Sequence, residues 1–289
     1  MSRFAGSIVA LVTPFRDGRV DFEKLDELVH RHMEAGTHGL VPCGTTGESA
    51  TLSHEEHDEV IARVVRAADG RIPVIAGTGS NSTDEAIRLT RHAQEVGADA
   101  SLQVAPYYNR PTQEGLYQHF KAIAAATDLP IILYNIPSRT GVNVTPETVI
   151  RLSELKTIVG IKEASGSIDQ AVEIIRGSDL DVLSGDDSMT LPLMAVGATG
   201  VISVAANVVP DLLVDLVDLA AEGDFKAAQE LHLRLFPLFK SLFIETNPSP
   251  VKAAMAIEGI IRDDVRLPLV SVTTSTREKL VKVLAELKS

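Results

Sequence analysis

A lysine in the middle of an apolar run has the clearest chemical potential in this sequence. The run IVGIKEASG around Lys162 is rich in β-branched residues and predicts a strand. Because side chains alternate between the faces of a strand, we expect Lys162 to share one face with Gly160 and Ala164, and Val159 to share the other with Ile161. The small residues would leave space around the amine. Burial disfavours the charged form of a lysine, and the neutral amine is a nucleophile that can form an imine with a carbonyl substrate.

A structural role for Lys162 is open from this strand alone, since its side chain could reach solvent at a strand end or pair with a carboxylate such as Glu163. Other polar residues at the ends of expected strands favour the chemical interpretation. They are Gly44-Thr45-Thr46-Gly47-Glu48, Tyr107-Tyr108, Tyr134 and Arg139. Ile132, Tyr134 and Ile136 share one face of their strand, so a phenol could project beside the lysine. Each signal is weak singly, but together they favour a lysine-centred enzyme.

Eight short apolar segments predict the strands that must position these residues. They span residues 7–15, 39–44, 73–79, 100–108, 130–137, 158–165, 181–187 and 200–208. Between them lie amphipathic segments with helix-start signals, since S-x-x-E/Q capping boxes begin at Ser53, Ser82 and Ser167. Eight strand–helix units favour an α/β fold of the (β/α)8 TIM-barrel type, in which the active site lies at the C-terminal ends of the strands. A doubly wound open sheet is the alternative, but no G-x-G-x-x-G motif follows the first strand.

The last part of the chain lacks this alternation. After about residue 223, three segments have helical periodicity and no strand pattern appears. We therefore expect two regions: a barrel over residues 1–222 that carries the active site, and a C-terminal three-helix region over residues 223–289.

Composition excludes several classes of function. The net charge of −12 argues against a nucleic-acid-binding surface, which needs clustered Lys and Arg. No apolar run approaches the roughly 20 residues that cross a bilayer. The N-terminal apolar run is broken by Pro14 and has no cleavage-site pattern, so we interpret it as a strand and not as a signal peptide. Cys43 is the only cysteine, which excludes an intrachain disulfide, and we expect a cytoplasmic location.

Three other candidate sites have simpler structural explanations. His54 and His57 form an H-x-x-H pair that could bind a metal, but no third ligand with suitable spacing follows, so we expect surface histidines and no metal site. Asp186 and Asp187 could bind Mg²⁺, yet a turn or helix cap is the better interpretation. Cys43 has no identifiable histidine partner, and we expect a small buried hydrophobic residue.

Stretches through most of the chain resemble one enzyme family. They include GSIVALVTPF, GTTGESATL, PYYNRPTQEGLYQHF, ILYNIPSRTG, GIKEASG and NPSPVK. The GTTGE loop and the GIKE strand are similar to those of the pyruvate-dependent, Schiff-base-forming lyases, the family that includes N-acetylneuraminate lyase. The IPSRTG context of Arg139 resembles the dihydrodipicolinate synthase (4-hydroxy-tetrahydrodipicolinate synthase) branch of that family.

The resemblance implies a reaction. Pyruvate, as a lysine-bound enamine, would condense with L-aspartate 4-semialdehyde to give 4-hydroxy-tetrahydrodipicolinate, the first committed step of diaminopimelate and lysine biosynthesis. No metal or organic cofactor is implied. Another pyruvate-dependent aldolase, such as an N-acetylneuraminate or keto-sugar-acid lyase, is the alternative. A non-catalytic barrel that senses a small metabolite is a further alternative from a different class.

The resemblance also implies roles for individual residues. Lys162 would be the imine-forming amine, and Tyr134, Thr46 and Tyr108 would form a proton relay. Thr45 and Thr46 would hold the pyruvate carboxylate. The other implied substrate-binding residues are Arg139, for the carboxylate of the semialdehyde, and Ile202, through its backbone carbonyl.

Assembly and regulation are implied in the same way. Tyr108 would reach into the active site of a neighbouring subunit, within a dimer or a homotetramer built as a dimer of dimers. L-lysine would be an allosteric effector, bound in a cleft at the subunit interface. The residues implied for that cleft are Ser49, Ala50, His54, His57, Asn81, Glu85 and Tyr107.

Overall fold

The computed structural model describes residues 3–288 and contains an eight-stranded parallel sheet. Its strands are β1 Gly6–Ala10, β4 Gly39–Val41, β5 Ile75–Gly77, β6 Ala100–Val104, β7 Ile131–Asn135, β8 Ile158–Glu163, β9 Asp181–Ser184 and β10 Gly200–Ser203. They are hydrogen-bonded in the order β4-β1-β10-β9-β8-β7-β6-β5. A parallel bridge between Leu40 and Val74 joins the two ends of that order, so the sheet closes into a barrel. The eight expected strand segments are confirmed, and the open-sheet alternative is wrong.

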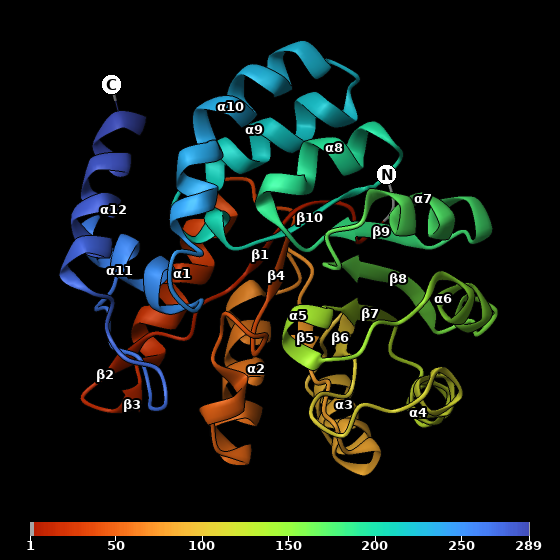
Figure 1. Ribbon diagram of the computed structural model, residues 1–289. Coiled ribbons are helices and arrows are strands. Elements are labelled where there is room, and N and C mark those ends of the chain that lie inside the picture. Colours follow the sequence, from red (N-terminus) through yellow and green to blue (C-terminus); the bar gives the residue numbers. More distant parts are fainter. Residues whose placement is uncertain (1–2, 289) are drawn as a thin grey trace.

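Helices cover the outside of the barrel (Figure 1). They are α1 Phe22–Glu34, α2 His54–Ala68, α3 Thr83–Glu95, α4 Gln113–Ala125, α6 Pro146–Ser153, α7 Ile168–Gly177, α8 Thr190–Ala195 and α9 Pro210–Ala221. Short helical turns follow strands at their C-terminal ends: η1 Ser49–Thr51, α5 Pro137–Thr140, η2 Asp187–Met189 and η3 Ala205–Asn207. These turns lie at the end of the barrel where the polar residues singled out above are also found. None of the helices in the described part of the chain combines the length and apolarity that a bilayer-spanning helix needs.

The segment after residue 223 contains α10 Phe225–Ser241, α11 Ser249–Ile257 and α12 Thr274–Leu287. Figure 1 shows α10 beside α9, and α12 beside α11. Leu235 of α10, Val251 of α11 and Leu284 of α12 belong to the same hydrophobic cluster as Leu213 of α9. The C-terminal helices therefore extend the apolar layer that surrounds the barrel.

The strands are buried on both faces, which explains their nearly continuous apolar sequence. Inside the barrel, a compact cluster includes Ile8, Leu102, Ile132 and Tyr134. Outside, the opposite strand faces join the larger cluster beneath the helices. A (β/α)8 barrel has this division, with a packed interior and no pore.

Two local expectations are wrong. The first expected strand, 7–15, ends early, because Phe15–Arg16 (β2) pairs antiparallel with Arg19–Val20 (β3). Asp17 and Gly18 both have positive φ, at 53° and 79°, as a tight two-residue hairpin turn requires. The capping box expected at Ser82 is also wrong, and at Ser167 only half of the box forms, because the Ser167 side chain accepts from the Gln170 N–H but the Ser167 N–H donates to Ser165 Oγ.

Ser53 forms its capping box with Glu56, but the side chain of Ser82 makes no capping bond within the described chain. Glu85, the residue expected to complete the second box, instead accepts a hydrogen bond from Ser80. The carboxylate of Glu85 is therefore drawn towards the loop that precedes α3.

Candidate active site

Lys162 and Tyr134 lie side by side in the barrel. They occupy partner positions in the neighbouring strands β8 and β7, and both side chains are buried. The Nζ atom of Lys162 lies 4.3 Å from the centroid of the Tyr134 ring. A lysine amine and a phenol are thereby brought into one buried space, as the strand faces predict.

An irregularity in β8 sets this alignment. Ile131 pairs with Ile158, whereas Ile132 pairs with Gly160, so Val159 is an extra residue in the ladder. Val159 consequently packs against the inner cluster, and Ile161 belongs to the outer one. The expectation that Val159 and Ile161 share a face is wrong, because the extra residue interrupts the strict alternation.

Glu163 does not serve as the structural partner that the sequence left open for Lys162. Its Oε2 atom accepts hydrogen bonds from Asn135 Nδ2 at 3.2 Å and Gln170 Nε2 at 3.0 Å. Its Oε1 atom accepts from the backbone N–H of Ser165 at 2.6 Å. The carboxylate thus belongs to a hydrogen-bond network on the side of β8 away from Tyr134, and it does not pair with Lys162.

Gly185 provides the space beside Lys162. It follows β9, and its N–H donates to the backbone oxygen of Glu163 at 2.8 Å, which holds it against β8. A Cβ atom at this position would lie 3.2 Å from Lys162 Cε and 2.6 Å from Ala164 Cβ. The φ of Gly185 lies outside the left-handed region, so lack of space, not backbone conformation, is what requires glycine here.

The Thr45–Thr46 loop follows β4 and folds back on itself. The N–H of Gly47 donates to Gly44 O, and the N–H of Glu48 donates to Thr45 O, each at 3.1 Å. Thr46 is buried, and its Oγ1 atom accepts a hydrogen bond from Asn247 Nδ2 at 3.0 Å. Because a hydroxyl has one proton and two lone pairs, this bond leaves the Thr46 proton available for a second partner.

Arg139 comes from the short helix α5 that follows β7. Its side chain is exposed, and Nη2 donates to the backbone oxygen of Asn247 at 3.2 Å. The guanidinium has five N–H donors, so most of them are free to bind a carboxylate. Asn247 also has a side-chain oxygen that is buried without a hydrogen-bond partner in the described chain.

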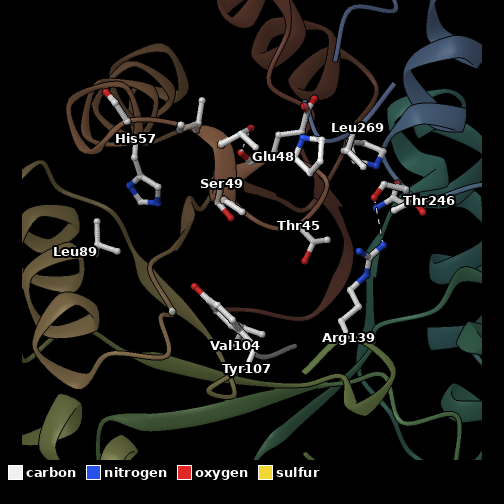
Figure 2. Close-up of a pocket in the computed structure, with 18 of the residues that line it drawn as sticks. Thr45, Glu48, Ser49, His57, Leu89, Val104, Tyr107, Arg139, Thr246 and Leu269 are labelled. Atoms are coloured by element: carbon white, nitrogen blue, oxygen red, sulfur yellow. Dashed lines mark hydrogen bonds between the residues drawn. The ribbon is translucent and has the colours of Figure 1, made fainter. Parts of the chain in front are cut away.

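A cavity of about 460 Å³ extends from Arg139 and Thr246, past Thr45, to Tyr107 and His57. Figure 2 shows these residues around it. A second recess of about 580 Å³ is lined by Arg139, Ala164, Gly185 and Asn247. Gly185 also lies against the stem of Lys162, so one wall of this second recess packs beside the lysine side chain. The combination of an amine, a phenol, threonine hydroxyls and a guanidinium can bind a small keto acid and activate its carbonyl.

Comparison with known proteins agrees with this chemistry. The model of the Dihydrodipicolinate synthetase family matches residues 3–287. The chain belongs to this family. A 4-hydroxy-tetrahydrodipicolinate synthase of Syntrophus aciditrophicus is 60% identical over 283 residues, which cover 97% of each chain.

Two solved structures of the family show the same fold. The crystal structure of the Aquifex aeolicus dihydrodipicolinate synthase has a TM-score of 0.97 and 53% identity, over 99% of this chain and 98% of that one. The Cyanidioschyzon merolae enzyme, solved with lysine bound, has a TM-score of 0.97 and 41% identity, over 100% of this chain and 99% of that one. The resemblance inferred from the motifs is confirmed over the full barrel and the C-terminal helices.

Tyr108 lies outside the site of its own chain. Its side chain is 90% exposed, and its φ is 71°, a left-handed conformation that is uncommon for residues other than glycine. Ile202, by contrast, lies within the barrel on β10, with its side chain in the inner cluster. The structure therefore places Lys162, Tyr134 and Ile202 within the barrel, and directs Tyr108 away from it.

The residues implied for an effector gather at the other end of the cavity. All except Asn81 line it: Ser49, Ala50, His54, His57, Glu85 and Tyr107. Asn81 contacts a residue that lines the cavity, since its Nδ2 atom donates to the backbone oxygen of Tyr107 at 3.2 Å. His54 Nε2 lies 3.2 Å from Glu85 Oε1.

His57 is buried, which corrects the expectation of a surface histidine. Its Nε2 atom is 3.0 Å from the backbone oxygen of Gly77, so Nε2 carries the proton and Nδ1 is an acceptor. Within residues 3–288, that Nδ1 atom is buried without a hydrogen-bond partner. Burial lowers the pKa of His57 to about 4. The ring is therefore neutral over the physiological range, and its unpaired Nδ1 acceptor lies 3.9 Å from Asp58 Oδ1.

The remaining candidates have structural roles. Asp186 caps η2 by accepting from the N–H of Ser188 at 2.8 Å, which confirms the cap interpretation. Asp187 is buried and accepts from the N–H groups of Val204 and Ala205. Cys43 is buried as expected, and burial raises the pKa of its thiol. Within residues 3–288, no three His, Cys, Asp or Glu side chains gather as a metal site requires.

Sequence reasoning missed two residues of the site. Gly185 lies within the expected strand 181–187, where the sequence gives no sign of its contact with Lys162. Asn247 begins the NPSPVK stretch, which marked the family resemblance but gave no role to the asparagine. Its contacts with Thr46 and Arg139 depend on the folding of a distant C-terminal segment over the barrel, and local periodicity does not report such contacts.

Proposed function

We propose that this chain condenses pyruvate with L-aspartate 4-semialdehyde to give 4-hydroxy-tetrahydrodipicolinate, and that Lys162 is the amine that carries pyruvate. The observation that carries the proposal is the buried Lys162 amine beside Tyr134, with Gly185 keeping space at its stem. The family and the named relatives support the same reaction.

The first half of the reaction joins pyruvate to Lys162. The amine adds to the keto carbon, and loss of water leaves an imine. A methyl proton then leaves to give an enamine, and this step needs a nearby base and a pocket with little water. Tyr134 supports the proton transfers from its place beside Nζ. Thr46, whose hydroxyl proton is left available by Asn247, supports them as a donor, and Thr45 and Thr46 hold the pyruvate carboxylate.

The second half uses the aldehyde. The enamine carbon attacks the aldehyde carbon of L-aspartate 4-semialdehyde and forms a carbon–carbon bond. The amino group of that substrate then attacks the imine carbon, closes a six-membered ring and releases Lys162. Arg139 binds the carboxylate of the semialdehyde, because its exposed guanidinium stands where the two recesses meet. Ile202 contributes its backbone carbonyl to the pyruvate end.

Borohydride reduction tests the proposal. Pyruvate and borohydride together should add one reduced pyruvyl group to the chain, on the peptide that contains Lys162, and should stop turnover. Lys162→Arg should form no adduct, since a guanidinium stays protonated. Arg139→Ala should still form the adduct but use the semialdehyde poorly. Unmodified wild-type protein, or label on another lysine, would contradict the proposal.

A neuraminate or keto-sugar-acid lyase activity is not favoured, since the named relatives are 4-hydroxy-tetrahydrodipicolinate synthases. A panel of aldehydes offered with pyruvate separates the two, because only the semialdehyde should give rapid consumption of pyruvate. A cytoplasmic location belongs to the same proposal, since the single cysteine forms no intrachain disulfide.

The proposal includes assembly and control. An exposed tyrosine held in a left-handed conformation supports a role for Tyr108 in a neighbouring subunit's site, within a dimer or a homotetramer. L-lysine is proposed as an effector at the His57 end of the cavity. Glu85 would accept from its α-ammonium, the Nδ1 atom of His57 from its ε-ammonium, and the Tyr107 region, held by Asn81, would bind its carboxylate. A family member solved with lysine bound supports this part.

A further inference from the structure

Glu48 stands at the centre of the loop that joins the two ends of the cavity. It follows Thr45 and Thr46 and immediately precedes Ser49. Its backbone is left-handed, with φ 54° and ψ 36°, a conformation that is uncommon for a residue other than glycine. Its N–H binds the oxygen of Thr45. The backbone of Glu48 is thereby hydrogen-bonded to that of Thr45.

The carboxylate of Glu48 is buried against the C-terminal part of the chain. Oε1 accepts a hydrogen bond from the Nζ atom of Lys252, which is fully buried on α11. Oε2 accepts from the backbone N–H of Arg266 at 3.0 Å. Lys252 Nζ also donates to the oxygen of Asp264 at 2.9 Å and lies 4.1 Å from the centroid of the Phe15 ring. Both carboxylate oxygens and the ammonium thus have partners.

Stability alone does not account for such a pair. Desolvation of two buried charges offsets much of their attraction, and apolar residues of similar volume often replace them without loss of stability. A paired carboxylate has a defined position, because two directed bonds hold it, whereas apolar packing is not directional. Asn247, which lies just before α11, holds Thr46 by a further directed bond. Residues 247–252 therefore hold the loop by bonds to Thr46 and to Glu48, on both sides of Gly47.

We propose that Glu48 and Lys252 are positioning residues for the pyruvate site: their buried ion pair holds the loop so that the Thr45 and Thr46 hydroxyls face the pyruvate carboxylate. This inference rests on the proposed function, since it assigns the loop to pyruvate. Both charged groups are buried, so we expect neither to touch the substrate. The pair acts through the bond from the Glu48 N–H to Thr45 and through the left-handed turn at Glu48.

Glu48→Gln and Lys252→Met test the pair. The glutamine keeps the shape of the side chain and an acceptor for Arg266, and the methionine keeps the apolar stem of the lysine. Each should raise the KM for pyruvate and slow adduct formation about tenfold, as expected for one lost charge-assisted hydrogen bond. The KM for the semialdehyde, which is bound through Arg139, should change less than threefold. The double variant should regain thermal stability, because no unpaired charge remains, but should keep the raised KM for pyruvate.

Arg63→Met is the matched control. It breaks the ion pair between Arg63 of α2 and Asp26 of α1, which lies away from the cavity. Its kinetic constants should match those of the wild type, whatever the change in melting temperature. The proposal would be overturned if folded E48Q and K252M kept the wild-type KM for pyruvate. It would equally be overturned if both KM values rose together, or if the double variant regained the KM along with stability.

A measurement on the wild-type protein covers the case in which the variants do not fold. Pyruvate should slow amide hydrogen exchange in residues 45–49 and, through the pair, in residues 264–266. Protection of the loop without residues 264–266 would overturn the inference. Failure of the wild type to form a pyruvate adduct would instead refute the proposed function, so the two failures are distinguishable.

Discussion

Lys162 and Tyr134 are partner residues in the neighbouring strands β8 and β7, with the lysine Nζ 4.3 Å from the centre of the tyrosine ring. The partnership depends on the extra residue Val159, which resets the alternation of β8 just before the lysine. The Tyr134 ring therefore packs directly against Nζ, and we expect its hydroxyl to take part in the proton transfers of imine formation. This arrangement leads to the first prediction.

Tyr134→Phe and Thr46→Val should each lower turnover by about 10²-fold, the usual scale of a lost general acid–base contribution. Both side chains are buried at the proposed pyruvate end, and each change removes only a polar group. Steady-state kinetics provides the measurement. Tyr117→Phe removes a phenol that lies on α4 against Arg151, outside the cavity, and should stay within twofold of the wild type. Equal losses in all three variants would contradict the assignment.

Gly185→Ala should abolish most adduct formation in a folded protein. The added methyl group would clash with Ala164 Cβ at 2.6 Å and crowd Lys162 Cε at 3.2 Å, so the end of β8 must shift and the fit of the lysine beside Tyr134 is disturbed. The rate of pyruvate adduct formation, read by mass spectrometry after borohydride reduction, measures the effect. The melting temperature shows whether the barrel is intact. An intact variant that forms the adduct at the wild-type rate would show that the space beside the stem is not needed.

Hybrid oligomers of two inactive variants test whether Tyr108 serves the active site of a neighbouring subunit. Tyr108→Phe and Lys162→Ala chains should each be nearly inactive alone, because one lacks the donated phenol and the other the amine. Unfolding and refolding them together should restore part of the activity, since a hybrid can combine an intact lysine with an intact tyrosine from its neighbour. Sedimentation of the active wild-type protein provides the control. An active monomer would contradict the shared site.

L-lysine should inhibit without competing with pyruvate, and His57 should contribute to inhibition down to about pH 5. The pKa of His57 is lowered to about 4, so its free Nδ1 acceptor is present above that pH and is lost only below it. His57→Ala should reduce sensitivity to lysine and leave turnover nearly intact. Inhibition curves at pH 7 and pH 5 for the wild type, His57→Ala and His54→Gln separate the two histidines. Undiminished inhibition of His57→Ala would contradict the assignment.

Sequence patterns predicted the barrel and the central pair because both depend on simple periodicities. Strands buried on two faces give continuous β-branched runs, and alternation along β7 placed Tyr134 inward. Parallel strands bring their C-terminal ends to one rim, which explains why residues from β4, β7 and β8 could be grouped in advance.

The parts that failed depend on contacts distant in sequence or on single-residue irregularities. A strict two-residue alternation of side chains does not predict the extra residue at Val159. The burial of His57 follows from its contact with Gly77 in the next strand, and the choice of Ser80 over Ser82 by Glu85 follows from the loop before α3. Asn247 reaches Thr46 only because the C-terminal segment folds over the rim. None of these contacts has a local pattern.

One consequence follows from the continuity of the cavity in Figure 2, where Arg139 and His57 border the same space. If a substrate site and an effector site lie in separate cavities, separate molecules must bind them. Here a single tethered compound, with a carboxylate for Arg139 and an ammonium for His57, could occupy both ends of the cavity at once. Its second contact would form at the high effective concentration that a short linker provides, so weak fragments would combine into a tight ligand. The cavity therefore offers a route to selective inhibition that neither end offers alone.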